Sequence, residues 1–484
     1  MLYSMASFFY KKSINSRRAI MSNPYLPRWE YIPDGEPRVF GDRVYIYGSH
    51  DLAGSGSFCD IVHKVWSAPV DNPNQWVCHG DIFRVSETRD HESDTDWTDE
   101  SARLFAPDVV EKDGKYYLYA YIDNKKGCVA VADRPEGPFK LLSKYKYTIP
   151  DEVCAGGLFI DPSVFVDDDG RAYIYCGFLK SFMAELEDNM YEIKDGTLIE
   201  HFIPSSDPVV LRPEDGFDVA DKTFFEAASM RKVGDTYYMI YSPKDCPNLA
   251  YATADKPTGP FKFGGYIVNS GADYPGGNNH GSIMNVNGQW YIFYHRMTNG
   301  TIMSRRGCVE KIEILPDGTI PEVEATSLGF EDSLNPYQIT DADIACVLTG
   351  GAFISERNVF ERFIRNITTD TIIGYRYYDF GKDFDSKTME FAAKVRGMGT
   401  NCRMNIFIDG VDSPDKLKTC KTVGKKIGSI EIGHDDEVIT TVVEAVTGRH
   451  AVYFTIETDY GDGWMADYFK GRSLFELESF VFMK

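Results

Sequence analysis

GDRVYIYGSHD, from Gly41 to Asp51, joins a turn that contains Gly and Asp to a run of tyrosine and aliphatic residues. The same pattern returns four times: DGKYYLYAYID from Asp113 to Asp123, DDGRAYIYCGF from Asp168 to Phe178, GDTYYMIYSP from Gly234 to Pro243 and NGQWYIFYHR from Asn287 to Arg296. Gly, Asp and Asn suit tight hairpin turns, and Tyr, Ile, Val and Phe suit half-buried strands. A unit of several strands that recurs five times is typical of a five-bladed β-propeller.

An ionisable residue stands a short distance before each of these runs. In chain order they are Asp34 in IPDGEP, Asp108 in FAPDVV, Asp161 in IDPSVF, Glu226 in FFEAAS and His280 in NNHGS. The start of a propeller blade is normally its inner strand, and equivalent places in successive blades lie at equivalent radius around the axis. The sequence therefore predicts that four carboxyl groups and one imidazole converge on the central channel.

Carboxyl groups gathered in one channel suit the hydrolysis of glycosidic bonds. Like charges held close repel one another and separate the pKa values, so that one acid stays protonated while its neighbour is ionised. A glycosidase uses such a pair of carboxyl groups on either side of the bond that it cleaves. The alternative is that some of these acids cap turns or accept backbone N–H groups, and it applies most to Asp108.

The order of these residues and the phrases around them resemble glycoside hydrolase family 43, five-bladed propellers that cleave arabinose- and xylose-containing glycans with inversion. The resemblance is carried by LFAPDVV, KYYLYAY, DPSVFVDDDGRAYIY, FFEAASMRKVGDTYYMIYS and the HGS of NNHGS, which follow in family order. It implies that Asp34 is the general base and Glu226 the general acid. It also implies that Asp161 raises the pKa of Glu226 and orients it.

The same resemblance implies residues that contact the substrate. His280 matches a histidine that lines the channel floor, in some members beside a calcium ion, and Arg305 in MSRRGCVE matches a substrate-contacting arginine. Phe105, Asp108 and Asp51 complete the expected substrate contacts. No cofactor is expected to be required, and a structural calcium ion near His280 stays open.

The composition favours an enzyme that acts on neutral glycans. The chain has 484 residues, of which 43% are hydrophobic and 14% aromatic, and this length predicts two or three domains with sizeable cores. The net charge of −22 argues against nucleic acid and against an anionic membrane surface as partners. We therefore expect an oligosaccharide substrate as the partner, and the sequence leaves the oligomeric state open.

The N-terminus and the cysteines favour a cytoplasmic enzyme. In MLYSMASFFYKKSINSRRAI the basic residues follow the apolar patch, whereas a signal peptide has them in front. We expect residues 1–22 to be a disordered tail or an artefact of a start site upstream of Met21. The ten cysteines show no paired spacing, and so we expect free thiols.

After residue 330 the blade pattern ends. Residues 340–484 contain short alternating runs between polar turns, among them CRMNIFIDG, HAVYFTIETD and LFELESFVFMK, which predict an antiparallel, jelly-roll-like β-sandwich. The stretches GYRYYDFG, TGRHAVYFTIE and LFELESFVF resemble a family 6 carbohydrate-binding module. We thus expect an all-β chain, with a propeller over residues 23–330 and this sandwich behind it.

The sandwich has two interpretations. Modules of family 6 bind sugars on loop aromatic residues, and Tyr375, Tyr377 and Trp464 are of the right type. The alternative, which we favour, is that the sandwich only packs against the propeller and shapes its rim.

The leading functional hypothesis is an inverting exo-glycosidase that releases terminal α-L-arabinofuranose from the oligosaccharides of hemicellulose. A β-D-xylosidase, a bifunctional enzyme and a β-D-galactofuranosidase are alternatives in the same class. A retaining, fructan-cleaving hydrolase is disfavoured because WMNDPNG-like and RDP motifs are missing. A non-catalytic sugar-binding propeller is disfavoured because all three acids are present, and a metal hydrolase because the nine histidines show neither HxH nor HExxH spacing.

Overall fold

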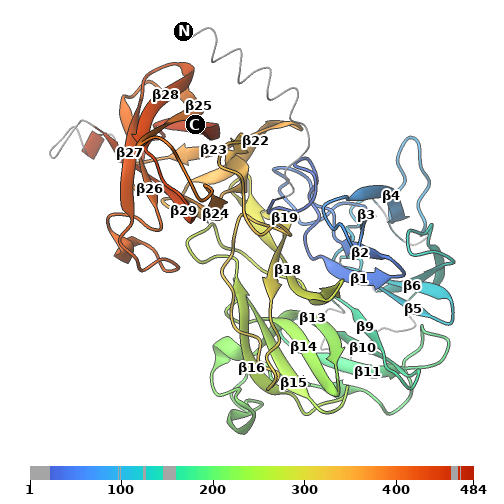
Figure 1. Cartoon of the computed structure of the whole chain (residues 1–484). Helices are drawn as coiled ribbons and strands as arrows, with labels where there is room; N and C mark the ends of the chain where they lie inside the picture. The colour runs from blue at the N-terminus through green and yellow to red at the C-terminus, as the bar shows by residue number, and fades with distance from the viewer. Residues whose placement is uncertain are drawn as a thin grey trace.

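The computed structural model describes residues 22–95, 98, 100–123, 127–144, 160–458, 467, 468 and 470–484. In this part of the chain, five small antiparallel sheets form a ring, and two larger sheets, orange to red in Figure 1, form a second body beside it. The predicted all-β fold, a five-bladed propeller followed by a β-sandwich, is confirmed. The predicted N-terminal tail, apart from Ser22, lies outside the described residues.

The blades follow one another along the chain. Their strands are β1 (Glu36–Phe40), β2 (Arg43–Gly48), β3 (Val62–Pro69) and β4 (Val77–Arg84); β5 (Asp108–Lys112), β6 (Lys115–Ala120), β7 (Cys128–Ala132) and β8 (Lys140–Lys144); β9 (Ser163–Val166), β10 (Ala172–Cys176), β11 (Phe182–Leu186) and β12 (Ile199–Glu200); β13 (Phe224–Val233), β14 (Thr236–Pro243), β15 (Asn248–Ala254) and β16 (Lys262–Asn269); and β17 (Ile283–Val286), β18 (Gln289–Thr298) and β19 (Thr301–Ile312). The five tyrosine-rich runs contain β2, β6, β10, β14 and β18, the second strand of each blade. The 3-10 turns η1 (Pro213–Asp215) and η2 (Ala220–Lys222) precede β13.

The first strand of each blade lies innermost. β1 contacts β5 and β17, while β9 contacts β5 and β13, so the first strands meet one another around the axis. Farther out, the faces of neighbouring blades share apolar cores, for example Tyr45 and Val65 of the first blade with Leu118 and Ala130 of the second. Burial of these faces is the main force that holds the ring together.

Charged side chains join the inner strands below the channel mouth. Arg38 of β1 donates to both oxygens of Asp108 on β5, at 3.0 and 2.6 Å, and to the carbonyl of Val164 on β9. Arg231 of β13 donates to Glu36 of β1. Two guanidinium groups thus balance two carboxylates that are at most 2% exposed, because an unpaired buried charge would be strongly destabilising.

The N-terminal segment closes the ring against the fifth blade. The side-chain amide of Asn23 donates to the carbonyl of Val309 and accepts from the N–H of Val309, both at 2.8 Å, so that it substitutes for a strand residue. Tyr25 donates its N–H to the carbonyl of Gly307 and packs edge-on against Phe293. This segment therefore fastens the start of the ring to its last strand, β19.

The sandwich consists of two packed antiparallel sheets. One has the order β22 (Phe353–Asn358), β23 (Glu361–Ile367), β30 (Phe475–Met483), β25 (Thr388–Gly397) and β28 (Asp436–Glu444), with β20 (Thr340–Asp341) on β30; the other has the order β21 (Val347–Leu348), β24 (Ile372–Asp379), β29 (Arg449–Thr458), β26 (Cys402–Ile408) and β27 (Lys425–Ile432). Two 3-10 turns, η3 (Ala342–Ile344) and η4 (Pro414–Lys416), lie between strands. Phe391, Phe454 and Phe480 pack together in the core between the sheets.

The sandwich lies against the side of the ring that carries β18 and β19 (Figure 1). Ion pairs around the buried Asp343 hold the two domains together. Asp343 of η3 accepts from Arg28 at 3.0 Å and from Arg306 at 3.2 Å, and Arg28 also pairs with Asp341 at 2.9 Å. Because Arg306 belongs to β19, this contact reaches the fifth blade of the propeller.

The aromatic residues considered for sugar stacking are used in packing where they are described. Tyr375 is fully buried. Tyr377 donates its hydroxyl to Glu324 at 2.6 Å, and the guanidinium of Arg449 covers its ring at 4.0 Å. Trp464 lies outside the described residues. The two tyrosines therefore agree with a sandwich that packs on the propeller.

No helix among the described residues is long and apolar enough to span a membrane.

We predict that Asn23→Ala loosens the closure of the ring. The substitution leaves the buried N–H and carbonyl of Val309 without their partner, and each such group costs about 1–3 kcal/mol. The Tm in differential scanning calorimetry should fall by several degrees relative to the wild type. Asn401→Ala, at an exposed position of the sandwich, serves as the control. Equal Tm values for the two variants would contradict this role of Asn23.

Candidate active site

The three predicted catalytic acids lie at the inner ends of blades one, three and four. Asp34 comes shortly before β1, Asp161 shortly before β9, and Glu226 lies on β13. They are close enough to interact, since the charge of Asp34 raises the pKa values of both others. Asp34 and Asp161 are 4% and 8% exposed, whereas Glu226 is half-buried. The structure thus brings the three carboxyl groups together, with Glu226 the most accessible.

The backbone at these acids adopts conformations that aim their side chains. Asp34 and Asp161 have φ angles of 54° and 51°, in the left-handed region that is costly for residues other than glycine. Glu226 lies where the register between β13 and β14 shifts, and the next residue, Ala227, has a φ of 64°. A β-bulge turns a side chain out of the regular alternation of a strand. Such strain is typical of sites where function fixes the geometry.

Several groups hold Asp34 in place. Its Oδ1 accepts from Arg305 Nη1 at 2.8 Å, and its Oδ2 accepts from the hydroxyl of Ser49 at 2.7 Å. Its backbone N–H donates to Nδ1 of His295 at 3.3 Å. Nε2 of His295 lies 2.9 Å from the carbonyl of Asn278 and must donate to it, so the ring is neutral with its proton on Nε2. Burial agrees with this assignment, since it lowers the pKa of His295 to about 3.

Asp34 is the ionised acid of the site. Burial by itself raises the pKa of Asp34, but the positive charge of Arg305 and the hydrogen bond from Ser49 outweigh it. The net effect lowers the pKa of Asp34 to about 2. Asp34 is therefore a carboxylate at neutral pH, as a general base must be.

Asp51 orients Arg305 from behind. Its Oδ2 accepts from the backbone N–H and from Nε of Arg305, both at 2.9 Å, and its Oδ1 accepts from Nη2 at 3.0 Å. Asp51 is 1% exposed and Arg305 is 2% exposed. Asp51 was expected to contact the substrate. Its two oxygens instead bind the guanidinium group of Arg305, which in turn binds Asp34. The ring of Phe58 covers Arg305 at 5.0 Å.

Glu226 and Asp161 are the acids that hold protons. Burial, followed by the charge of Asp34, raises the pKa of Glu226 to about 7. Burial and the charges of Glu226 and Asp34 raise the pKa of Asp161 well above its ordinary value. The shift of Glu226 thus has burial and Asp34 as its main causes, and the predicted effect of Asp161 on it stays a prediction.

His280 and Phe105, two further expected substrate contacts, differ in how far they are buried. His280 is 5% exposed, and its Nδ1 lies 3.8 Å from Oδ1 of Asp34 and 3.6 Å from Oδ2 of Asp161. Burial lowers the pKa of His280, so the ring is neutral at pH 7. Phe105 is half-buried and packs edge-on against Tyr121. His280 thus lies beside Asp34 and Asp161, and the substrate contacts of His280 and Phe105 stay predictions.

Asp108 does not lie at the channel mouth. It is 0% exposed, and its two oxygens accept from Arg38 and from the N–H of Val164. The expectation of a sugar contact is corrected here, because the carboxylate is occupied by the ion pairs that join the inner strands. This is the structural alternative that the sequence left open for Asp108.

Ser49, Asn278 and His295 were not singled out from the sequence. Ser49 directly follows β2 and His295 lies on β18, so both stand near the end of a tyrosine-rich run. A polar residue near the end of a tyrosine-rich run is the sequence signal that could have identified Ser49 and His295. Asn278 stands two residues before His280, and its side chain donates to Oε1 of Glu226 at 3.4 Å.

The described residues include no group of three or more His, Cys, Asp or Glu side chains that could hold a metal ion. Calcium takes six to eight oxygen ligands. Asp34 and Asp161, the acids near His280, each have one carboxylate oxygen within 4 Å of its ring. The two oxygens of Asp34 also accept hydrogen bonds from Arg305 and Ser49. A calcium ion near His280 stays a prediction.

Comparison with known proteins identifies the family. The model of glycosyl hydrolases family 43 matches residues 74–320 and ends before the sandwich. The chain is 42% identical to a xylosidase/arabinosidase of Thermoclostridium stercorarium over 90% of this chain and 95% of that protein. It is 34% identical to xylosidase/arabinosidase 43A of Humicola insolens over 60% of this chain and 96% of that protein.

A solved structure agrees with this match. The GH43_1 enzyme of Xanthomonas citri, complexed with xylotriose, is 28% identical and superimposes with a TM-score of 0.51, covering 66% of this chain and 98% of that chain. The family model, the relatives and the propeller architecture all lead to one conclusion. This chain belongs to glycosyl hydrolases family 43.

Proposed function

We propose that this protein is an inverting, exo-acting glycosidase that releases terminal α-L-arabinofuranose and β-D-xylose from arabinose- and xylose-containing oligosaccharides. One observation carries the proposal: burial and charge lower the pKa of Asp34 to about 2 and raise the pKa of Glu226 to about 7 within one site. Between these values one carboxyl group is ionised and the other is protonated. A glycosidase needs such a pair, whether it inverts or retains the configuration.

Asp34 acts as the general base in the proposed reaction. A carboxylate oxygen has two lone pairs, so Asp34 can accept a water proton while it keeps its bonds to Arg305 and Ser49. The water attacks the anomeric carbon from the side opposite to the leaving oxygen. The bond between that carbon and the glycosidic oxygen breaks, and the configuration is inverted.

Glu226 acts as the general acid. It is partly exposed, so its proton can reach the glycosidic oxygen as the bond breaks. Asn278 donates to Oε1 of Glu226 and orients the carboxyl group. After the reaction Asp34 holds the proton of the water and Glu226 is ionised, and exchange with solvent restores both.

The choice of sugar rests on the relatives. The proteins from Thermoclostridium stercorarium and Humicola insolens are both named for xylosidase and arabinosidase activity, which supports a single site that accepts both sugars. An arabinofuranoside and a xylopyranoside present similar arrangements of hydroxyl groups. A β-D-galactofuranoside is the third substrate that a test should include.

We predict that Asp34→Asn lowers kcat on 4-nitrophenyl α-L-arabinofuranoside and on the β-D-xylopyranoside together, by about 10²–10⁴-fold, because the general base is lost. Glu226→Gln should lower kcat on natural oligosaccharides more than on these nitrophenyl substrates, whose leaving group needs little protonation. Asp188→Asn, at a fully exposed position, is the matched control.

Loss of only one of the two activities in Asp34→Asn would contradict a single shared site. Wild-type turnover that survives in both variants would contradict the assigned roles. If the wild type cleaves the galactofuranoside alone, the proposed sugars are wrong while the mechanism stands.

We predict that kcat/KM falls about tenfold per pH unit above pH 7, because Glu226 must be protonated and its raised pKa is about 7. The lowered pKa of Asp34 keeps the base ionised down to about pH 3, so the acidic limb should lie far below the basic one. Initial rates between pH 4 and 9, with circular dichroism as a control for folding, should show the basic limb and no loss of activity down to pH 4. A flat profile up to pH 9 would refute Glu226 as the acid.

A further inference from the structure

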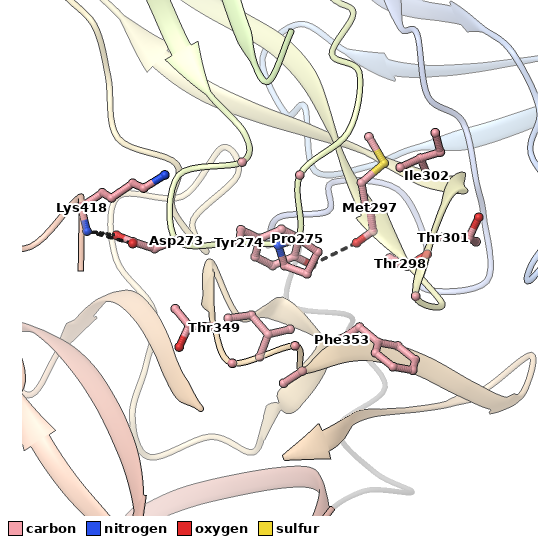
Figure 2. Close-up of a pocket in the computed structure, with 17 residues that line it drawn as sticks. Asp273, Tyr274, Pro275, Met297, Thr298, Thr301, Ile302, Thr349, Phe353 and Lys418 are labelled. Carbon is pink, nitrogen blue, oxygen red and sulfur yellow. Dashed lines mark hydrogen bonds between the residues drawn. The ribbon is translucent and has the colours of Figure 1, made fainter. Parts of the chain in front are cut away.

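A cavity of ≈ 600 Å³ lies between the propeller and the sandwich, and we call it the seam cavity (Figure 2). Its walls come from residues 271 and 273–276 before β17, residues 297, 298 and 300–302 at the β18–β19 hairpin, residues 348–353 before and at the start of β22, and Lys418. Its volume falls within the range of about 300–1,000 Å³ of small-molecule sites. Both domains contribute walls, so the cavity exists only in the whole chain.

The seam cavity adjoins the candidate active site along the fifth blade. Met297, which lines the cavity, is paired with Arg305 across β18 and β19. His295, which accepts from the N–H of Asp34, lies two residues earlier on β18. Alternate residues of a strand share a face and lie about 7 Å apart. The cavity wall is therefore the continuation of the face that carries His295.

A second connection runs through the loop before β17. Gly276 lines the seam cavity, and Asn278, two residues later, donates to Glu226. The general acid lies beside the leaving oxygen, so the part of a substrate behind that oxygen starts on this side of the site. The leaving chain of an oligosaccharide therefore starts near the loop that also lines the cavity.

The lining of the seam cavity suits a neutral saccharide. The carboxylate of Asp273 accepts from the backbone N–H groups of Lys418 and Thr419 and from the hydroxyl of Thr419, at 2.7–2.8 Å. In Figure 2, Lys418 and Asp273 lie on one side of the cavity and Phe353 on the other. This bonding occupies the acid and fixes the loop to the sandwich.

Apolar and polar groups alternate on the remaining walls. The ring of Phe353 packs over Gly300 and is partly exposed, and Ile302 is 43% exposed. Thr298, Thr301 and Thr349 and five glycines add hydroxyl and backbone groups around them. A sugar ring has an apolar C–H face and a rim of hydroxyls, and an apolar pocket with a few polar groups matches both.

We propose that the seam cavity binds the leaving chain of the substrate, a neutral oligosaccharide of pentose units, on the side of the cleaved bond opposite to the terminal sugar. The proposal rests on the proposed function and extends it. The sandwich then forms part of the substrate site through Phe353 and Lys418. Chains of several sugars therefore bind better than a monosaccharide glycoside.

The test compares two substrates in matched variants. Phe353→Ala removes the ring from the cavity wall, and Phe360→Ala removes an exposed ring from the turn between β22 and β23, outside the cavity. The measured quantity is the ratio of kcat/KM on xylotetraose to kcat/KM on the 4-nitrophenyl β-D-xyloside. We expect Phe353→Ala to lower this ratio at least about tenfold and Phe360→Ala to keep the wild-type ratio.

Ile302→Ser provides a second variant in case Phe353→Ala lowers the Tm. An unchanged ratio in both cavity variants, or an equal change in Phe360→Ala, would overturn the proposal.

Calorimetry separates this proposal from the proposed function. Xylotetraose is titrated into Glu226→Gln, which keeps the cavity but lacks the general acid, with and without Phe353→Ala. A Kd at least about tenfold weaker in the double variant supports the seam cavity whether or not the wild type cleaves xylosides. Equal Kd values, or no binding to Glu226→Gln, would overturn it. A wild type that binds xylotetraose but cleaves none of the tested glycosides would overturn the function alone.

Discussion

The buried ion pairs of Arg305 with Asp34 and Asp51 set the chemistry of this protein. Asp34 and Asp161 are both buried aspartates with a left-handed backbone, yet the pKa of Asp34 is lowered to about 2 and that of Asp161 is raised. The difference is the guanidinium group that touches only the first. Once Asp34 is ionised, its charge raises the pKa of Glu226 as well. Arg305, oriented by its hydrogen bonds to Asp51, thereby makes Asp34 the ionised base and leaves Glu226 as the proton donor.

The propeller makes this arrangement possible because blades one, three, four and five each bring one of Asp34, Asp161, Glu226 and His280 to the region where their inner strands begin. The charge cluster of Glu36, Arg38, Asp108 and Arg231 fixes these strands relative to one another below the site. The sandwich adds a contact to the loop before β17 through Asp273, and this loop also carries Asn278 and His280. The site thus depends on packing around the whole ring and on the second domain.

Much of this could be predicted from the sequence, because repeats and turns are local signals. The five tyrosine-rich runs predicted the blades, and the ionisable residue before each run predicted the channel. Pairings between blades could not be predicted, since the partner of Asp108 is Arg38 from another blade. The sequence also does not distinguish a catalytic carboxylate from one that forms a structural ion pair. The bulge that aims Glu226 and the seam cavity depend on contacts between distant segments, which a repeat pattern does not encode.

The stereochemistry of hydrolysis tests the account most directly, because it reports how water and the general acid are placed around the anomeric carbon. Proton NMR can follow the anomeric signals while the enzyme cleaves 4-nitrophenyl β-D-xylopyranoside, before the product mutarotates. With Asp34 activating water opposite to Glu226, α-xylose must appear first. If β-xylose appears first, the reaction retains configuration, and the assignment of Asp34 as a base that activates water is contradicted.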